Sequence, residues 1–323
     1  MTDDLFQYDK KALFSTLVDI LNNFIDFCNG NNLKYAAFAG TLLGAVRHNG
    51  IIPWDDDVDV VMPRKDYDVL QKLIKENSAC RGGIQYKFLN TALDPYFPKG
   101  FTRLTNIYTT EIPIKDAMYK YNHGCFIDIF PLDAIPDDRL SRNIYFRMIG
   151  LYLSLLQAVA RYQSGIGTIG LSSSKKLSYY AFLPFFKTNI LNTQNIYSRL
   201  DSYASKYSKR NKSYREMGTT IFSVGNQRFI FSSDDYNSEL IDLPFENITI
   251  KAPKEYDSIL RKSYGDYMTP VRQPSEHGET IVDVTIGYED YIRNHHDELK
   301  EIFNKVKSHQ LIKGKLDESK PEE

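Results

Sequence analysis

The fold of this chain is decided by residues 38–62, which read FAGTLLGAVRHNGIIPWDDDVDVVM. The pattern predicts a strand over residues 34–39, a turn at Gly40 and Thr41, and a short helix over residues 42–47. Because glycine has no side chain, the backbone at Gly40 can approach a phosphate closely. The amides of the helix start and the Thr41 hydroxyl could then bind the phosphate oxygens, although Gly40 could equally serve the turn alone.

The acidic run at the end of this stretch carries the candidate chemistry. Residues 57–62 predict a second strand, and positions two apart on a strand point to the same face, so Asp57 and Asp59 should project together. Two adjacent carboxylates repel each other unless a cation lies between them, and carboxylates without softer ligands suit Mg²⁺ or Mn²⁺. Asp55 and Asp56 are expected on the loop that leads into the strand. A solvated acidic loop is the alternative, but its fusion to an apolar strand argues against it.

A third carboxylate, Asp128, is the one charge within the apolar run 125–130. A lone carboxylate in such a run is costly unless it has a partner, so Asp128 is a candidate third metal ligand. A strand, a Gly-Thr turn, a helix, a second turn and an Asp-x-Asp strand together form the layout of the nucleotidyltransferase fold. We therefore expect an α/β chain, with an α+β core built on a mixed sheet. Asp133 is expected to cap a turn instead.

Other residues are candidates for substrate binding around this centre. Arg47 and His48 follow the predicted short helix and could contact phosphate, although a salt bridge is the alternative for Arg47. Trp54 abuts the carboxylates and could bind a quaternary ammonium group by cation–π attraction, or simply pack in the core. Arg103 is a weaker candidate for phosphate. Residues 264–267 could shape the pocket from the C-terminal side, or end a helix.

The composition divides the chain into four parts. Residues 1–138 are expected to form a nucleotidyltransferase-like catalytic core. Residues 139–250 are basic, aromatic-rich and mainly helical, and form an insertion or a second subdomain. Residues 251–311 should complete the core from the C-terminal side. Residues 312–323 are rich in lysine and acidic residues and are expected to be disordered.

Charge is distributed unevenly along a chain whose net charge is only −1. Residues 139–215 hold thirteen lysines and arginines against one acidic residue, Asp201. A segment with this charge could bind an anionic partner: a lipid headgroup, a phosphorylated glycan or a nucleic acid. The alternative is that it pairs with the acidic remainder of the chain. Residues 179–191 add aromatic side chains next to lysines, which is typical of a membrane-surface element but also of packing in a helical subdomain. Nucleic acid is disfavoured because no recognition motif is evident, and a peripheral membrane contact through 139–215 stays open.

Cysteine usage and the start of the chain indicate the compartment. The three cysteines are scattered and form no C-x-x-C pair, and the acidic N-terminus is followed by no apolar run. No apolar window of about 18 residues or more occurs, so no transmembrane helix is expected. We therefore expect a cytoplasmic protein, which could lie on the inner face of the membrane.

The motif residues also resemble a known family. Residues 38–60 resemble the signature of the LicD family, which includes bacterial phosphocholine transferases and is related to the animal fukutin and fukutin-related proteins. Residues 126–133 resemble a second block of that family, and residues 253–277 a third. Residues 139–250 resemble none of these blocks, and we expect substrate specificity to lie there.

The resemblance implies a transferase that moves phosphocholine, or a related phospho-alcohol, from a CDP-activated donor such as CDP-choline to a sugar hydroxyl, releasing CMP. The acceptor would be a cell-surface glycan or teichoic-acid precursor, lipid-linked precursors included. One or two Mg²⁺ (or Mn²⁺) ions held by Asp57, Asp59 and Asp128 would neutralise the diphosphate, and Asp128 is the best candidate for taking the proton from the hydroxyl. Two alternatives stay open: transfer of a nucleoside monophosphate from a nucleoside triphosphate, and a non-catalytic membrane- or glycan-associated binding protein.

Overall fold

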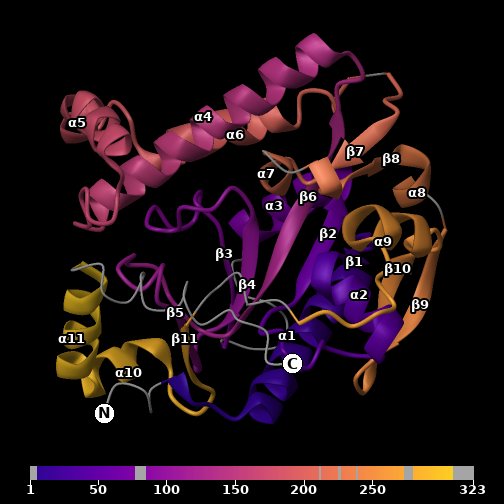
Figure 1. Cartoon of the computed structure of the whole chain (residues 1–323), viewed down its shortest axis with the longest axis horizontal. Coiled ribbons are helices and arrows are strands. Elements are labelled where there is room, and N and C mark those ends of the chain that lie inside the picture. The colour runs from indigo at the N-terminus through magenta and orange to yellow at the C-terminus, as the bar shows by residue number, and fades with distance from the viewer. Residues whose placement is uncertain are drawn as a thin grey trace.

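The chain folds as a mixed α/β structure around one seven-stranded sheet, as the sequence predicts (Figure 1). The predicted disordered tail, residues 312–323, lies outside the residues that the structure describes, and so does His277 at the end of the third family block. The computed structural model describes residues 6–76, 85–210, 212–224, 227–237, 239–272 and 279–307.

The central sheet combines parallel and antiparallel pairs. β2 and β6 run parallel near its centre, β1 pairs with β2 antiparallel, and β4 and β3 continue the sheet antiparallel beyond β6. β6 pairs with β2 and β4 through its first half and with β7 through its last residues, and β8 follows β7. The strands are β1 Ala36–Ala37, β2 Asp59–Pro63, β3 Tyr86–Leu89, β4 Thr102–Asn106, β6 Phe126–Ile135, β7 Glu216–Gly218 and β8 Ile230–Ser232.

Three helices from the first part of the chain surround these strands. α1 is N-capped by Asp9, whose side chain accepts hydrogen bonds from the amides of Lys11 and Ala12. The apolar side of α1 is buried in the main core. The predicted short helix is present as α2, but it begins at Ala39, before the predicted turn at Gly40 and Thr41, rather than at residue 42. These helices are α1 Lys10–Gly30, α2 Ala39–His48 and α3 Arg64–Glu76.

The basic region begins with an arm of three helices that extends beyond the sheet (Figure 1). α4 and α6 lie side by side and share a second apolar cluster with α5. α4 covers the mostly apolar stretch 144–160, but Ile144 and Leu151 are exposed on it. Across the described ranges, no helix is long and apolar enough to cross a membrane. The helices of the arm are α4 Arg139–Gln163, α5 Ser173–Lys187 and α6 Thr193–Ala204.

The remaining elements return the chain to the core. The hairpin of β9 and β10 packs beside β1, and β5 pairs with β11 in a small separate sheet. α9 ends at Gly265, whose positive φ of 67° favours glycine. These elements are β5 Thr110–Pro113, α7 Thr220–Ser223, the 3₁₀ turn η2 Gln227–Phe229, α8 Ser233–Asn237, β9 Leu240–Phe245, β10 Ile248–Pro253, α9 Tyr256–Tyr264, β11 Thr280–Asp283, α10 Tyr288–Asn294 and α11 His296–Lys307.

The predicted role of Asp133 is wrong. It does not cap a turn but lies within β6, fully buried, and accepts two hydrogen bonds from Arg64 at 2.7 and 2.6 Å. Arg64 also donates a hydrogen bond to Asp201 of α6 at 2.7 Å. A buried carboxylate needs such a partner. The ion-pair cluster therefore joins α3 and β6 to the helical arm, through the one acidic residue of the basic segment.

Candidate active site

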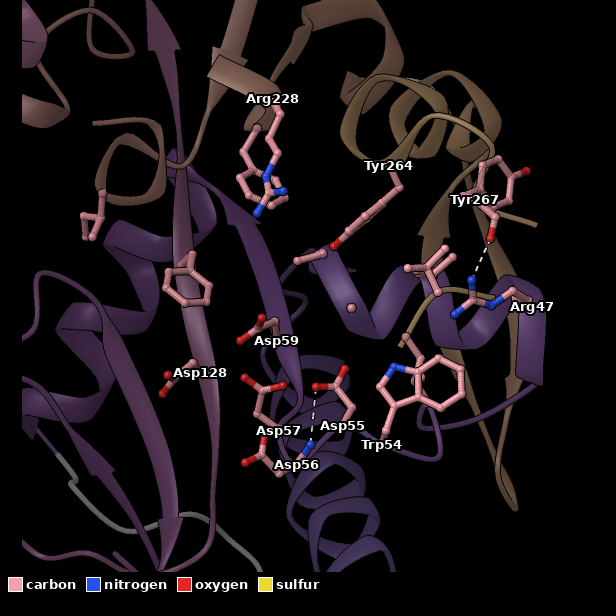
Figure 2. Close-up of a pocket in the computed structure, with 18 of the residues that line it drawn as sticks. Arg47, Trp54, Asp55, Asp56, Asp57, Asp59, Asp128, Arg228, Tyr264 and Tyr267 are labelled. Carbon is pink, nitrogen blue, oxygen red and sulfur yellow. Dashed lines mark hydrogen bonds between the residues drawn. The ribbon is translucent and has the colours of Figure 1, made fainter. Parts of the chain in front are cut away.

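A cavity of about 500 Å³ lies where the starts of β2 and α2 meet β4 and β6 (Figure 2). The 3₁₀ turn η2 and the end of α9 complete its walls, so it draws on segments far apart in the sequence. Its lining includes six carboxylates, Asp55, Asp56, Asp57, Asp59, Asp128 and Asp266, and five basic side chains, Arg47, Lys99, Arg103, Lys115 and Arg228.

Asp59 and Asp128 are neighbours because β2 and β6 run parallel with these two residues in register. Both are largely buried, with 8 % and 6 % of their surface exposed. β2 begins at Asp59 and not at Asp57 as predicted, so Asp57 belongs to the loop that precedes the strand. Figure 2 nevertheless shows the carboxylates of Asp57 and Asp59 next to each other, with Asp128 across from them on β6. All three predicted ligands line the cavity.

The loop before β2 carries three carboxylates instead of the two that were predicted, because Asp57 lies in the loop as well. Asp55, Asp56 and Asp57 each offer one oxygen, and these oxygens lie within 4.8 Å of one another. Asp56 is a loop residue as expected, but it is only 6 % exposed. Burial, and then the neighbouring charge of Asp59, raise the pKa of the Asp57 carboxyl well above its ordinary value. A cation at this point would remove the repulsion, and a donor set made only of carboxylate oxygens suits Mg²⁺ or Mn²⁺.

Gly40 and Thr41 lie in the first turn of α2 rather than in a turn before it. Gly40 lines the cavity. Thr41 is only 5 % exposed, and its Oγ1 accepts a hydrogen bond from the Asp59 amide at 2.7 Å. Thr41 therefore fixes the start of β2, a role that differs from the predicted phosphate contact. Because the first amides of a helix have no acceptor within it, those at the start of α2 are still candidates for binding phosphate.

We expect Gly40→Ala to disturb the acidic loop while the fold persists. A Cβ atom at Gly40 would lie 2.6 Å from Asp55 Oδ2, which is too close for a nonbonded contact. Asp55 must then move together with its loop, and a misplacement of about 1 Å should lower kcat/KM about 100-fold. Steady-state kinetics and a thermal melt measure both effects. Gly150→Ala in α4, whose Cβ would meet Val224 at 3.3 Å, is the matched control. Equal activity of the two variants would contradict this reading of Gly40.

Asp128 is held by Arg103 of the neighbouring strand β4. Arg103 Nε and Nη2 donate to the two Asp128 oxygens at 2.7 and 3.0 Å, and Arg103 is only 2 % exposed. The guanidinium also lies over the ring of Phe126, 3.2 Å from its centre. Arg103 was only a weak candidate for a phosphate contact, and the structure shows its Nε and Nη2 engaged by Asp128 in the bidentate geometry that favours such pairs. The pair orients Asp128 and balances part of the negative charge of the site.

A contacting group of side chains lies near the end of α2. It consists of Arg47 and His48 of the helix and Trp54 of the loop that follows. Arg47 Nη1 donates to the backbone carbonyl of Tyr267 at 2.7 Å, and its Nε donates to His48 Nδ1 at 3.3 Å. The His48 ring meets Trp54 edge-on, with ring centres 5.9 Å apart. Arg47 and Trp54 line the cavity, and His48 supports both of them. Burial, and then the charge of Arg47, lower the pKa of His48, which keeps its ring neutral at neutral pH.

Arg228 is a cavity residue that the sequence did not single out. It comes from the turn η2, within the region where no family motif was recognised. Figure 2 shows Arg228 and the hydroxyl of Tyr264 entering the cavity from the side opposite the carboxylates. Burial, and then the charge of Asp59, raise the pKa of Tyr264, so its hydroxyl stays a donor. Residues 264–267 thus do both things predicted of them, because Tyr264 and Tyr267 line the cavity and Gly265 ends α9.

Glu111 is a further carboxylate behind the acidic loop. It lies on β5 and is only 1 % exposed. Burial, and then the charge of Asp56, raise its pKa well above the ordinary value, so the neutral acid is favoured. The sequence offered only one signal for Glu111, which is the single charge in the stretch 107–114.

The mixed sheet and its group of carboxylates agree with the layout expected of a nucleotidyltransferase-type domain, and comparison with known proteins shows which family this part of the chain resembles. Residues 32–146 match the family model described as LicD/FKTN/FKRP, nucleotidyltransferase domain. That range contains Asp57, Asp59 and Asp128 together with the strands that carry or precede them. This part of the chain is therefore similar to the LicD family, as the motif residues indicated.

Three relatives also match parts of the chain, one of them over more residues than the family model. The chain is 25 % identical over 259 residues to the lipopolysaccharide cholinephosphotransferase LicD of Haemophilus influenzae, which covers 78 % of this chain and 88 % of that protein. An uncharacterised protein of Rickettsia prowazekii is 43 % identical over 67 residues, 21 % of this chain and 24 % of that protein. One from Rickettsia typhi is 41 % identical over 68 residues, 21 % of each chain.

Proposed function

We propose that this protein transfers phosphocholine, or a related phospho-alcohol, from a CDP-activated donor to a sugar hydroxyl and releases CMP. The acceptor would be a lipopolysaccharide or another cell-surface glycan, teichoic-acid precursors included. The observation that carries the proposal is the group of carboxylates around Asp57, Asp59 and Asp128, which shares one cavity with basic side chains. The similarity to the Haemophilus influenzae cholinephosphotransferase supports the choice of the transferred group.

Mg²⁺ or Mn²⁺ is part of this proposal. Asp57 and Asp59 would hold the ion, with Asp128 as the third ligand. The fit rests on the donor chemistry. The oxygens of Asp55, Asp56 and Asp57 lie within 4.8 Å of one another, and the charges of Asp59 and Asp128 are among those that, after burial, raise the Asp57 pKa. When bound, the ion would neutralise the donor diphosphate and the charge that develops on the departing CMP.

The side chains of the cavity would bind the substrates and move one proton. The sugar oxygen attacks the choline-bearing phosphorus, the bond from this phosphorus to the bridging oxygen breaks, and CMP leaves with the electron pair. The hydroxyl proton passes to Asp128, whose oxygens each keep a second lone pair beside the Arg103 hydrogen bonds. Arg228 and the Tyr264 hydroxyl bind phosphate oxygens from the opposite wall. Trp54 offers a ring face to the quaternary ammonium.

Release of CMP tests this function. The purified protein is incubated with Mg²⁺, a lipopolysaccharide acceptor and, separately, the CDP esters of choline, ethanolamine, glycerol and ribitol. We expect CMP from at least one donor, together with a matching gain of mass on the acceptor. Pyrophosphate from a nucleoside triphosphate would instead support nucleoside monophosphate transfer. No product under either condition would favour a non-catalytic binding protein and refute the proposal.

Metal binding is expected to depend on pH through Asp57. Because its carboxyl pKa is raised, a proton competes with Mg²⁺, so Mg²⁺ should raise the Tm more at pH 8 than at pH 5.5. Without metal, stability should fall as the pH rises from the ordinary carboxyl pKa of 3.8 toward the raised value, because the unfolded chain then binds fewer protons than the folded one. Thermal melts of the wild type and of Asp57→Asn check both trends. A Tm gain that is independent of pH would count against Asp57 as a ligand.

A further inference from the structure

Helix α5 is apolar on both of its sides. On the inner side Phe186 is buried and contacts Tyr162 of α4, with ring centres 6.0 Å apart. On the outer side Leu177, Tyr180 and Phe185 are 74 %, 58 % and 46 % exposed. A helix that only covered the surface of a domain would be polar on its outer side, so these apolar side chains indicate a contact surface.

The charge around α5 has a single sign. Residues 139–190 contain seven lysines and arginines and neither Asp nor Glu. Lys175 and Lys176 lie in the first turn of α5, and Lys187 is its last residue. Within the ranges that the structure describes, the ion pairs of the arm use other basic residues, and none involves these three lysines. The outer side of α5 therefore combines apolar side chains with uncompensated positive charge.

The position of α5 makes this side accessible. α5 stands at the outer end of the helical arm, away from the central sheet (Figure 1). Of the large apolar side chains that are exposed in the described residues, eight lie within 139–190 and four elsewhere. The apolar surface is thus concentrated on the arm. It is not scattered over the molecule as incidental exposure would be.

We propose that the outer side of α5 docks on a lipid bilayer that carries anionic headgroups. Leu177, Tyr180 and Phe185 would enter the boundary between headgroups and acyl chains, while the lysines at the two ends of the helix bind headgroup phosphates. The docking does not depend on which group the active site transfers. It would hold the enzyme beside acceptors that are linked to lipid.

A second copy of the chain is the competing occupant of this surface. A symmetric contact through α5 would bring together Lys175, Lys176 and Lys187 of two copies, and residues 139–190 offer no carboxylate to pair with them. An anionic bilayer supplies both an apolar layer and the opposite charge. The charge pattern therefore favours lipid over self-association.

Co-sedimentation of the full chain with vesicles tests the proposal. We expect the protein to sediment with vesicles of phosphatidylcholine mixed with phosphatidylglycerol, to do so less at high salt, and to stay in solution with phosphatidylcholine alone. Leu177→Ser with Phe185→Ser should weaken binding at least about tenfold, because two exposed apolar side chains are lost. Lys175→Gln with Lys176→Gln should weaken it about fivefold for each lysine.

A matched control variant separates loss of the α5 surface from a general loss of exposed apolar side chains. Light scattering measures whether the protein forms a dimer in solution. Val69→Ser with Tyr108→Ser removes exposed apolar side chains outside the arm and should bind vesicles as the wild type does. All variants should keep the wild-type Tm, since the replaced side chains are exposed. The proposal is overturned if anionic vesicles do not sediment the protein or if the α5 variants bind unchanged. A dimer in solution that the α5 apolar variant dissociates would overturn it as well, in favour of the second copy.

Discussion

Asp57→Asn and Asp59→Asn should each reduce turnover at least about 1,000-fold, the scale on which a main electrostatic group at a reacting centre acts. Asparagine keeps the size and shape of the side chain but removes the charge that would hold the cation. The two residues approach the same region from the loop and from the first position of β2. Initial rates of CMP release at saturating Mg²⁺ measure the effect.

The same variants should remain folded, which separates a catalytic from a structural role. Burial and repulsion raise the Asp57 pKa, so removal of its charge should leave the metal-free Tm unchanged or higher at neutral pH. Asp242→Asn is the matched control, because Asp242 is 56 % exposed and pairs with Lys251 on the β9–β10 hairpin. It should keep full activity. Turnover near the wild-type rate in Asp57→Asn or Asp59→Asn would refute the assignment of these carboxylates.

The second large effect is expected from Arg103→Met, which leaves Asp128 buried without its partner. Both Asp128 oxygens accept hydrogen bonds from Arg103, and the two side chains are only 8 % and 3 % exposed. Removal of one partner of a buried ion pair costs about 3–5 kcal/mol of unfolding free energy. Activity should fall as well, because Asp128 loses the group that orients it. Urea unfolding and CMP release measure the two losses.

A double variant distinguishes the ion pair from simple loss of packing. Arg103→Met combined with Asp128→Leu removes both charges, and replacement of a buried pair by apolar residues is often neutral in stability. We therefore expect the double variant to recover most of the stability that Arg103→Met loses, while it stays inactive. If the two losses merely add, the pairing is not what stabilises this part of the sheet.

Much of the core could be predicted from local sequence. Helices α1 and α3 show apolar side chains at helical spacing, and turn residues flank α2. Such patterns extend over only a few positions, so they indicate a helix without knowledge of the tertiary structure. Asp128 was inferred to share a site with Asp57 and Asp59 because a lone charge in an apolar run needs a partner, and the parallel register of β2 and β6 places Asp128 beside Asp59. The extent of a strand depends on its neighbours, which is why β2 begins after Asp57.

Residues whose roles depend on distant partners were not predicted. Asp133 was expected in a turn, because nothing near it in sequence reveals Arg64 as its partner across the sheet. Arg228 reaches the cavity only because the chain returns to the sheet after the helical arm. The hydrogen bond that the Thr41 hydroxyl accepts from the Asp59 amide was not predicted either, and the phosphate contact of Thr41 stays a prediction. Contacts of this kind follow from tertiary packing, for which a single sequence holds no local signal.

The central claim is metal-dependent phosphoryl transfer at the carboxylates of the cavity, and phosphorus NMR tests it most directly. CDP-choline is incubated with the protein and a lipopolysaccharide acceptor, first with Mg²⁺ and then with a chelator. We predict that the diphosphate signals are replaced by those of CMP and of a phosphodiester on the acceptor, and that the chelator or Asp57→Asn stops this change. Unchanged conversion in the chelator, or in Asp57→Asn, would contradict the account.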